Sequence, residues 1–242
     1  MEDRGESHGY GAEEAAVYDA IYQAKKDYDA EAAKLHVLIL RHKKSPGNAL
    51  LDMACGTGLH LARLKSLYAV EGVDLSEHQL AIARSRNPDL RFTHGDMFEL
   101  DLGRRFDIVT CLFSSIGYAR NPDRLRQAVA AMAKHLVEGG VLFVEPWILP
   151  ENFVPGVLHA DFVDQPELKV ARMNISRVES RIAVVDMHYM VGRPTGIQEF
   201  ISRHELGLFT HEEYLDSIAH AGLQPVFEPE GLMRRGLYAG IR

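Results

Sequence analysis

The sequence lacks the features that mark several classes of protein. It has only two cysteines, Cys55 and Cys111, and neither falls in a Cys-x-x-Cys or Cys/His spacing, so we expect reduced thiols and no metal site. Its longest apolar runs, such as residues 141–144, are far shorter than the roughly 20 residues of a membrane-spanning helix. Residues 1–14 lack the basic start and apolar run of a secretory signal. These absences predict a cytoplasmic protein with no membrane partner.

Positive charge is also scarce. The 27 Lys and Arg residues against 34 Asp and Glu give a formal net charge of -7, and no basic stripe is visible. A protein that binds a phosphate backbone needs clustered positive charge to displace counterions, so we expect no nucleic acid partner. An apolar fraction of 46% is ordinary for a globular protein, and 242 residues suffice for one domain with a sizeable core.

What the sequence does contain is an alternation of short apolar runs and longer amphipathic stretches from Ala49 onward. Such alternation is typical of βαβ units, which build a parallel sheet. Five strands are predicted, at residues 49–53, 69–73, 90–93, 106–112 and 141–145. Helices fill the gaps: Ser76 with Gln79 resembles a capping box, and Asn121 before Pro122 places an N-cap before a proline at the first helical position.

Other patterns flank this core. Residues 13–42 have apolar side chains at helical spacing, which predicts two helices. Period-two segments at residues 168–178, 182–191 and 198–208 predict an antiparallel sheet. Thr210 with Glu213, and Gly222 beyond them, predict a capped helix, and two last strands are expected at residues 224–228 and 236–241.

Together these elements predict one doubly wound, Rossmann-like α/β domain with a seven-stranded sheet. N-terminal helices occupy residues 1–46, the cofactor-binding core residues 47–147 and 209–242, and a small antiparallel insertion residues 148–208. We expect the insertion to select the substrate, because proteins that share a core differ in specificity mainly through the segments added to it. An exposed sheet is also easily paired, so the same insertion is the expected surface of a homodimer.

The strongest motif is the glycine turn LLDMACGTG at residues 50–58. Gly56 and Gly58 let the backbone approach a ligand at the carboxyl end of the first strand, where doubly wound folds bind cofactors. By itself this turn also fits a purely structural role. A dinucleotide-binding GxGxxG motif needs a glycine where the chain has Leu61, so an NAD-dependent oxidoreductase is the weaker alternative.

Acidic residues follow the next two predicted strands. Asp74 ends the second strand, where a carboxylate can accept hydrogen bonds from both ribose hydroxyls, as it can in an NAD enzyme. Asp96 follows the third strand, where it can accept from an adenine amino group while Met97 packs on the ring. Either acid alone is well explained as a solvated loop residue. Both acids together with the glycine turn, at the ends of three successive strands, indicate a bound cofactor far more specifically.

At these positions the sequence resembles the class I S-adenosylmethionine methyltransferases, whose glycine turn, acid after strand two and GDM after strand three line one cofactor site. The resemblance implies S-adenosylmethionine as cofactor and S-adenosylhomocysteine as product. Backbone groups of Ala54 and Gly56 would approach the methionine moiety, Asp52 would orient its amine, and Leu112 would lie beneath the sulfonium. The complete set implied at the cofactor is Tyr18, Lys26, Asp52, Ala54, Gly56, Gly58, Asp74, Leu75, Asp96, Met97 and Leu112.

Motifs outside the core make the resemblance more specific. They are VYD at residues 17–19, KDY at 26–28, FSSIG at 113–117, VEPW at 144–147, PENF at 150–153 and RGL at 235–237. Over residues 10–240 the chain is similar to the nucleotide-linked aminosugar N-methyltransferases of antibiotic pathways, which dimethylate desosamine-type and mycaminose-type sugars on dTDP. The implied reaction is two successive methyl transfers to the primary amine of a dTDP-amino-deoxyhexose.

The same resemblance implies a substrate site. Tyr10 and Arg235 would contact the sugar nucleotide, since a guanidinium pairs with phosphate oxygens as a rigid fork and Arg234 doubles the local charge. The further candidates are Ser115, Tyr118, Trp147, Phe153 and Arg172, of which the two large aromatics fit a core role equally well.

Other functions remain as alternatives to this one. They are methyl transfer to another small amine or hydroxyl acceptor and a noncatalytic cofactor-binding role. Because the chain has 12 histidines, neither His188 nor His204 in the predicted antiparallel sheet is taken as catalytic.

Tyr118 stands where members of this family have His or Tyr, so we expect no obligatory histidine base. The sulfonium is a strong electrophile, and alignment of a neutral amine contributes roughly 7–11 kcal/mol, whereas a positioned base contributes about 10²–10⁴-fold in rate. We therefore predict that Tyr118→Phe keeps substantial turnover, whereas Asp74→Ala loses cofactor affinity. Methyl-transfer assays and calorimetric titration with S-adenosylhomocysteine measure the two effects. An inactive Tyr118→Phe with intact cofactor binding would contradict this ranking.

Overall fold

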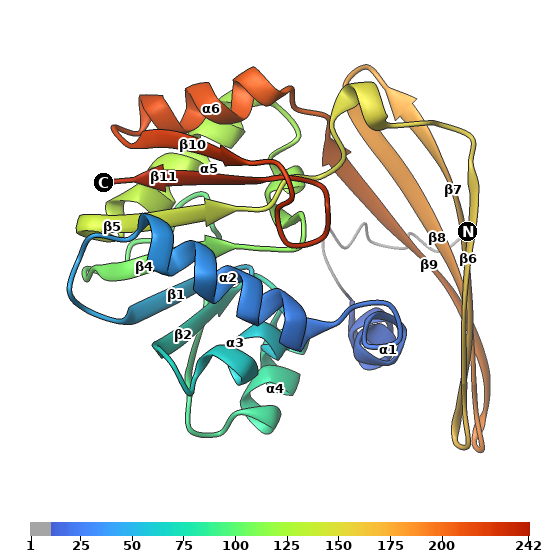
Figure 1. The fold of residues 1–242 in the computed structure, drawn as a ribbon. Helices are drawn as coiled ribbons and strands as arrows, with labels where there is room; N and C mark the ends of the chain where they lie inside the picture. The colour runs from blue at the N-terminus through green and yellow to red at the C-terminus, as the bar shows by residue number, and fades with distance from the viewer. Residues whose placement is uncertain (1–10) are drawn as a thin grey trace.

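Two β-sheets organise residues 11–242, the part of the chain that the computed structural model describes (Figure 1). The larger sheet has seven strands in the order β10-β11-β5-β4-β1-β2-β3, and the smaller has four in the order β6-β7-β8-β9. Figure 1 shows the smaller sheet standing to one side of the larger one, beyond the tips of its central strands. The predicted α/β fold with an antiparallel insertion is confirmed.

The larger sheet begins with five parallel strands and ends with an antiparallel pair. Its strands are β1 (Ala49–Met53), β2 (Ala69–Asp74), β3 (Arg91–His94), β4 (Phe106–Cys111), β5 (Leu136–Val144), β10 (Gln224–Glu228) and β11 (Leu237–Ile241). Because β1 pairs with both β2 and β4, the strand order reverses beside it. Such a reversal is the topological switch point where open α/β sheets bind ligands.

Helices cover both faces of this sheet. They are α2 (Tyr28–His42), α3 (Leu59–Leu64) and α4 (Glu77–Arg86) on one face and α5 (Pro122–Lys134) and α6 (His211–His220) on the other. Helix α1 (Ala12–Tyr22) and the short 3-10 turns η1 (Ser115–Ala119) and η2 (Pro150–Asn152) complete the set. The expected caps are present. The Asn121 side chain accepts from the Arg124 N–H at 3.0 Å, and Thr210 and Glu213 form a reciprocal capping box.

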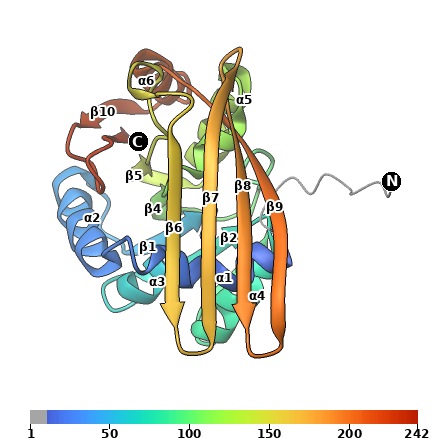
Figure 2. The same ribbon diagram turned by 90° about the vertical axis from the view of Figure 1, so that its right-hand side faces the viewer.

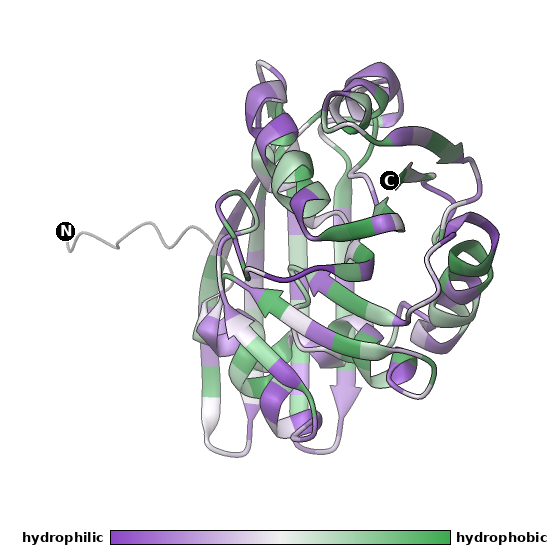
Figure 3. Cartoon of the chain, turned by 90° about the vertical axis from the view of Figure 1, so that its left-hand side faces the viewer, coloured by the Kyte–Doolittle hydropathy of each residue, from purple (hydrophilic) through white to green (hydrophobic). Residues whose placement is uncertain are grey.

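Successive side chains of each strand point to opposite faces of the larger sheet, so each face has its own apolar core. Leu51 and Val109 point toward the layer of α5 and α6, whereas Leu50 and Ile108 point toward α2, α3 and α4. Figure 3 shows the central strands coloured mainly as hydrophobic and the helices as mixed. Burial on both faces explains why these strands have continuous apolar runs in the sequence.

Apart from the start of β5, the predicted strand boundaries lie within two residues of those in the structure. The fifth strand begins at Leu136, earlier than the predicted residue 141, because it pairs with Phe106 across a bulge before the main ladder starts. The third strand is shifted by one residue, to Arg91–His94. Helices α1 and α2 agree with the two helices expected within residues 13–42.

The smaller sheet has one strand more than the sequence predicted. Its strands are β6 (Leu158–Gln165), β7 (Leu168–Glu179), β8 (Ile182–Arg193) and β9 (Gly196–Gly207), all antiparallel (Figure 2). Strand β6 was missed because it lies at the edge and buries only Val163, so its burial pattern carries little period-two signal. Between residues 11 and 242, no helix is long and apolar enough to cross a membrane.

Helix α1 lies between the two sheets. Its Val17 and Ile21 pack on Val163, Val170 and Tyr189 of the smaller sheet in a third apolar cluster. The helix also reaches the glycine turn of the larger sheet through polar contacts. It therefore joins the insertion to the core.

Candidate functional site

A cavity of about 550 Å³ lies between the carboxyl ends of β1, β2 and β4 and the inner face of the smaller sheet. A volume of this size is ordinary for a site that binds small molecules. The predicted site residues that line it are Tyr18, Asp52, Ala54, Gly56, Asp74, Leu112, Ser115, Tyr118, Trp147, Phe153, Arg172 and Arg235. One cavity thus brings together residues that the sequence assigned to a cofactor and to a second ligand.

The glycine turn after β1 is held in an unusual backbone conformation. Ala54, Gly56 and Gly58 all have positive φ angles, of 60°, 56° and 72°. Glycine adopts this region freely, but a residue with a Cβ such as Ala54 does so at a cost, and such strain concentrates at ligand sites. Ala54 and Gly56 line the cavity, and Gly58 serves as the N-cap residue of α3.

Asp74 ties the end of β2 to this turn. The Gly56 N–H donates to one carboxylate oxygen at 2.8 Å, and the Ser76 N–H donates to the other at 2.9 Å. Burial raises the pKa of Asp74, and these backbone N–H groups partly offset that rise. The carboxylate therefore organises the turn before any ligand arrives.

Gln79 is a buried amide in the same part of the cavity. It is 1% exposed, and its Oε1 atom has no hydrogen-bond partner within residues 11–242. A buried acceptor without a donor costs free energy, so this oxygen favours a ligand that donates a hydrogen bond. The sequence placed Gln79 only in a helix cap and missed this position.

Asp52 lies deeper, at 2% exposure, where its carboxylate accepts from the Thr110 hydroxyl at 2.7 Å. Burial raises the pKa of Asp52 to about 7, and the nearby charge of Asp74 adds to the rise. A cationic group bound beside it would favour the ionised form. This end of the cavity therefore suits a ligand with an ammonium group.

Helix α1 is fastened over the turn by Asp19. The Thr57 hydroxyl donates to Asp19 at 2.6 Å, and Arg86 forms an ion pair with Asp19 while donating to the Thr57 carbonyl at 2.5 Å. Tyr18 and Tyr22 of the same helix line the cavity. Asp19 thus sets how closely α1 covers the site.

Lys26 was predicted at the cofactor, but its side chain lies outside the cavity. Its Nζ atom is 3.1 Å from a Glu31 carboxylate oxygen and 3.4 Å from the centre of the Phe113 ring, which stands in the cavity wall. The adjacent Lys25 lines the cavity instead. Lys26 is buried behind this wall because α1 ends at Tyr22 and the connection to α2 turns its side chain inward.

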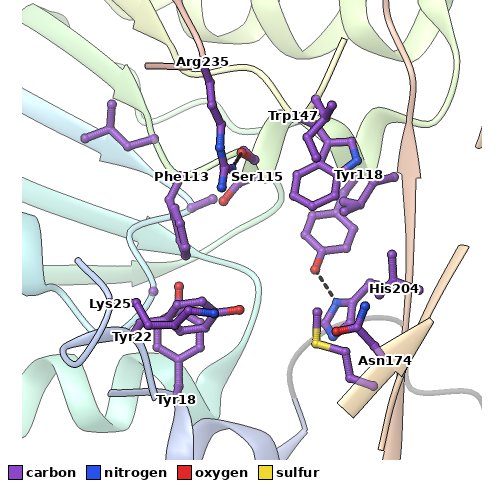
Figure 4. A pocket seen from close by; sticks show the side chains of 18 of the residues that line it. Tyr18, Tyr22, Lys25, Phe113, Ser115, Tyr118, Trp147, Asn174, His204 and Arg235 are labelled. Atoms are coloured by element: carbon purple, nitrogen blue, oxygen red, sulfur yellow. Dashed lines mark hydrogen bonds between the residues drawn. The ribbon is translucent and has the colours of Figure 1, made fainter. Parts of the chain in front are cut away.

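Arg235 lines the cavity, and its side chain lies beside Ser115 (Figure 4). Its guanidinium donates to the Ser114 hydroxyl at 3.3 Å and lies 5.8 Å from the centre of the Trp147 ring. The adjacent Arg234 is exposed and has a φ angle of 61°. Within residues 11–242, no ion pair includes Arg235, so its charge is available to an anionic ligand.

Arg172 lies on the inner face of β7 and is 4% exposed. It forms an ion pair with Asp161 and donates to the Tyr22 hydroxyl at 3.0 Å. Its charge is therefore already offset, which leaves Arg235 the better arginine for a phosphate. Asn174 and Ser176 follow Arg172 at period two and also line the cavity, a signal that the sequence contained.

Several predicted residues fall outside the lining. Asp96 accepts from the Phe98 N–H at 3.0 Å, Met97 packs against the apolar core, and Leu75 is 54% exposed. All three follow β2 or β3 beside Asp74, at the edge of the cavity. Tyr10, expected at the sugar nucleotide, lies outside the described residues.

Comparison with known proteins adds three findings. A methyltransferase domain model matches residues 50–140. The chain is 43% identical, over 98% of its length and 94% of the relative, to a dTDP-3-amino-3,6-dideoxy-alpha-D-glucopyranose N,N-dimethyltransferase of Streptomyces fradiae. It is 38% identical to the crystal structure of Streptomyces venezuelae DesVI, with a TM-score of 0.89 over 96% of this chain and 99% of that one.

A further similar structure contains a bound cofactor. It is an SAM-bound amino pentose methyltransferase of Micromonospora echinaspora, involved in calicheamicin biosynthesis. The two chains are 38% identical and superimpose with a TM-score of 0.84, over 93% of this chain and 96% of the other.

The raised pKa of Asp52 predicts a pH-dependent stability. The pKa of Asp52 is near 4 in the unfolded protein and about 7 in the folded protein. Between these two pH values the folded protein binds the proton more tightly, so the free energy of unfolding falls as pH rises. Asp52→Asn cannot ionise, so from pH 5 to pH 8 it should gain roughly 2–3 kcal/mol relative to the wild type. Urea unfolding without ligand measures this difference. The exposed Asp216→Asn is the control, and a gap between Asp52→Asn and wild type that does not change with pH would contradict the prediction.

Proposed function

The chain belongs to the family of dTDP-aminosugar N,N-dimethyltransferases, and from that premise we propose that it methylates the amine of a dTDP-linked amino-deoxyhexose twice, with S-adenosylmethionine as methyl donor. The observation that carries this proposal is the single cavity that runs from Asp74 to Arg235. A donor at one end and a nucleotide sugar at the other would meet inside it. The product would belong to antibiotic sugar biosynthesis, because the similar amino pentose methyltransferase is involved in calicheamicin biosynthesis.

The cofactor half is proposed from the geometry of the glycine turn. Backbone groups of Ala54 and Gly56 would hold the methionine moiety, and the buried carboxyl of Asp52 would orient its ammonium group. Asp74, already fixed by two N–H donors, has lone pairs left for ribose hydroxyls. Asp96 and Met97 follow β3, next to β2 and Asp74, where an adenine would extend beyond the ribose.

The remaining cofactor contacts are proposed for three side chains that line the cavity. Leu112, at the end of β4, would lie beneath the sulfonium, and Tyr18 would cover it from α1. Gln79 adds the buried amide oxygen that needs a donor. Together these groups enclose the methyl donor and exclude water from it.

The sugar-nucleotide half is proposed around Arg235. Its guanidinium would pair with the diphosphate, a role in which a planar fork suits phosphate oxygens. Trp147 and Phe153 offer aromatic surfaces to the sugar or the base, and Ser115 and Tyr118 offer hydroxyls. Catalysis then rests mainly on alignment, because the bound cofactor supplies an activated methyl group and the amine needs only to be neutral and in line.

The outer face of the smaller sheet supports a homodimer. Leu158, Phe162, Met173, Ile175 and Ile201 are all at least 45% exposed. Strand register places most of them in adjacent rows: Leu158 is opposite Ile175, and Met173 and Ile201 flank one residue of β8. Several exposed apolar side chains on one face favour association although His188 lies between two of them, and a twofold axis would bury the same patch on both copies.

Residues 148–208 would thus have two functions. Their inner face closes the substrate half of the cavity, and their outer face would bind the second copy. A cytoplasmic location is also proposed, which the free thiols of Cys55 and Cys111 support.

Replacement of Arg235 tests the proposed substrate. Removing a hydrogen-bonded charge from an anion site costs about 1.5–3 kcal/mol, so Arg235→Ala should raise KM for a dTDP-aminosugar by about 10–150-fold. Affinity for S-adenosylhomocysteine should stay within about twofold of wild type, because Arg235 contacts Ser114 and Trp147 rather than the glycine turn or Asp74.

The exposed Arg234→Ala is the matched control for this change. The assay follows labelled methyl transfer to a panel of dTDP-3-amino and dTDP-4-amino sugars, free amines and phenols. Transfer to a free amine or phenol alone, or equal effects of Arg234→Ala and Arg235→Ala, would refute the proposal.

The dimer proposal predicts that a charge on the outer face separates the copies. Ile201→Glu should convert a dimer to a monomer in light scattering after size exclusion, because the carboxylate would be buried without a partner in the interface. Val37→Glu, on the exposed side of α2, is the control and should remain dimeric. A wild-type monomer at micromolar concentration, or a dimeric Ile201→Glu, would exclude this face as the interface.

A further inference from the structure

A chain of hydrogen bonds leads from the cavity wall to the N-terminal helix. The Tyr118 hydroxyl lies 2.7 Å from Nδ1 of His204, a contact drawn in Figure 4, and His204 Nε2 lies 3.1 Å from a Glu14 carboxylate oxygen. The three residues come from η1, β9 and α1. Tyr118 and His204 line the cavity, whereas Glu14 is buried behind them at 3% exposure.

Glu14 determines where the protons of this chain lie. Burial raises the pKa of Glu14, but hydrogen bonds from His204, from Ser202 at 2.6 Å and from Tyr189 at 2.9 Å outweigh it, so the net pKa is below its ordinary value. An ionised carboxylate only accepts hydrogen bonds, so the Nε2 atom of His204 carries a hydrogen and donates it. In a neutral ring Nδ1 is then the acceptor, and the Tyr118 hydroxyl donates to it.

The neighbouring titratable groups are neutral, so they leave this pattern of donors and acceptors unchanged. Tyr18 on α1 and Tyr189 on β8 face the same region, and burial raises the pKa of each phenol, so both stay neutral. Ser202 on β9 is also neutral. Glu14 therefore supplies the negative charge that would stabilise a protonated His204.

Successive methylation of one amine requires a proton to leave between the two transfers. In the first transfer the nitrogen lone pair forms a bond to the methyl carbon, and the carbon–sulfur bond breaks with its electron pair passing to sulfur. The product is a protonated secondary amine, which has no lone pair. It cannot attack a second methyl group until it loses a proton.

We propose that Tyr118, His204 and Glu14 form a relay that takes this proton inside the closed site, an inference that rests on the proposed function. The amine N–H proton passes to the Tyr118 oxygen as the Tyr118 proton passes to Nδ1 of His204. The resulting imidazolium is held by the Glu14 carboxylate and later returns its proton to water. Tyr118 touches the substrate in this step, whereas His204 and Glu14 act through it and are positioning residues.

The relay accounts for the inner position of His204. His188 belongs to the same sheet, but it points to the exposed outer face, opposite Met173 and Ile201. Of these two histidines, His204 is the one that connects a cavity hydroxyl to a buried carboxylate. The first transfer can use an amine that binds already neutral, so loss of the relay should affect the second transfer more.

The pH dependence of the two transfers tests the relay. Tyr118→Phe and His204→Gln should keep most of the first transfer at pH 7 and lose about tenfold or more in the second, so that monomethyl product accumulates. The deficit should shrink as pH approaches 10, because the released monomethyl amine then loses its proton in solvent and binds again in its neutral form. Exposed His220→Gln is the control and should follow the wild type at every pH.

A constant deficit across the pH range, or no deficit at pH 7, would overturn the relay and indicate a structural role. Calorimetry with S-adenosylhomocysteine and dTDP checks that each variant still folds and binds. Tyr118→Phe removes only a hydroxyl, so it carries the test if His204→Gln does not fold.

Nitrogen-15 NMR of histidine-labelled protein gives a second readout that does not depend on the acceptor. It should find a hydrogen on Nε2 of His204, and an Nδ1 signal that shifts in Tyr118→Phe. A hydrogen on Nδ1 would overturn the relay even if the enzyme methylates dTDP-aminosugars. Conversely, a wild type inactive on those sugars would refute the proposed function while this spectrum still decides the relay.

Discussion

The attachment of helix α1 to both sheets is the constraint on which the site depends. Asp19 binds Thr57 of the glycine turn and Arg86 of α4, while Val17 and Ile21 pack on the inner face of the smaller sheet. One helix therefore fixes the distance between the two walls of the cavity. Without it, the cofactor turn and the insertion would be separate surfaces rather than one enclosed site.

The same helix brings three polar groups, of which Glu14 is buried, to the cavity and its wall. Glu14 reaches His204, Asp19 reaches the glycine turn, and Tyr18 lines the site between them. Buried charges are tolerated only when they are paired or hydrogen-bonded. Each of these contacts therefore stabilises the closed arrangement and also prepares a group for a ligand.

The two sheets divide recognition between them. The larger sheet supplies strained backbone and carboxylates at a switch point, features that suit a cofactor shared by many methyltransferases. The smaller sheet supplies every second side chain of its strands, and these side chains can be substituted without disturbing the core. This division explains how relatives with the same fold act on different aminosugars.

The sequence by itself determined the parallel strands, the caps of α5 and α6 and the glycine turn with Asp74, because apolar periodicity and turn chemistry are local properties of the chain. Only the tertiary structure decided which of two adjacent or similar residues faces the cavity. Lys25, Arg235 and His204 line the cavity, whereas the adjacent or similar residues Lys26, Arg234 and His188 do not. Arg172 forms an ion pair with Asp161. Those choices depend on contacts between segments far apart in the chain, which spacing along the sequence does not encode.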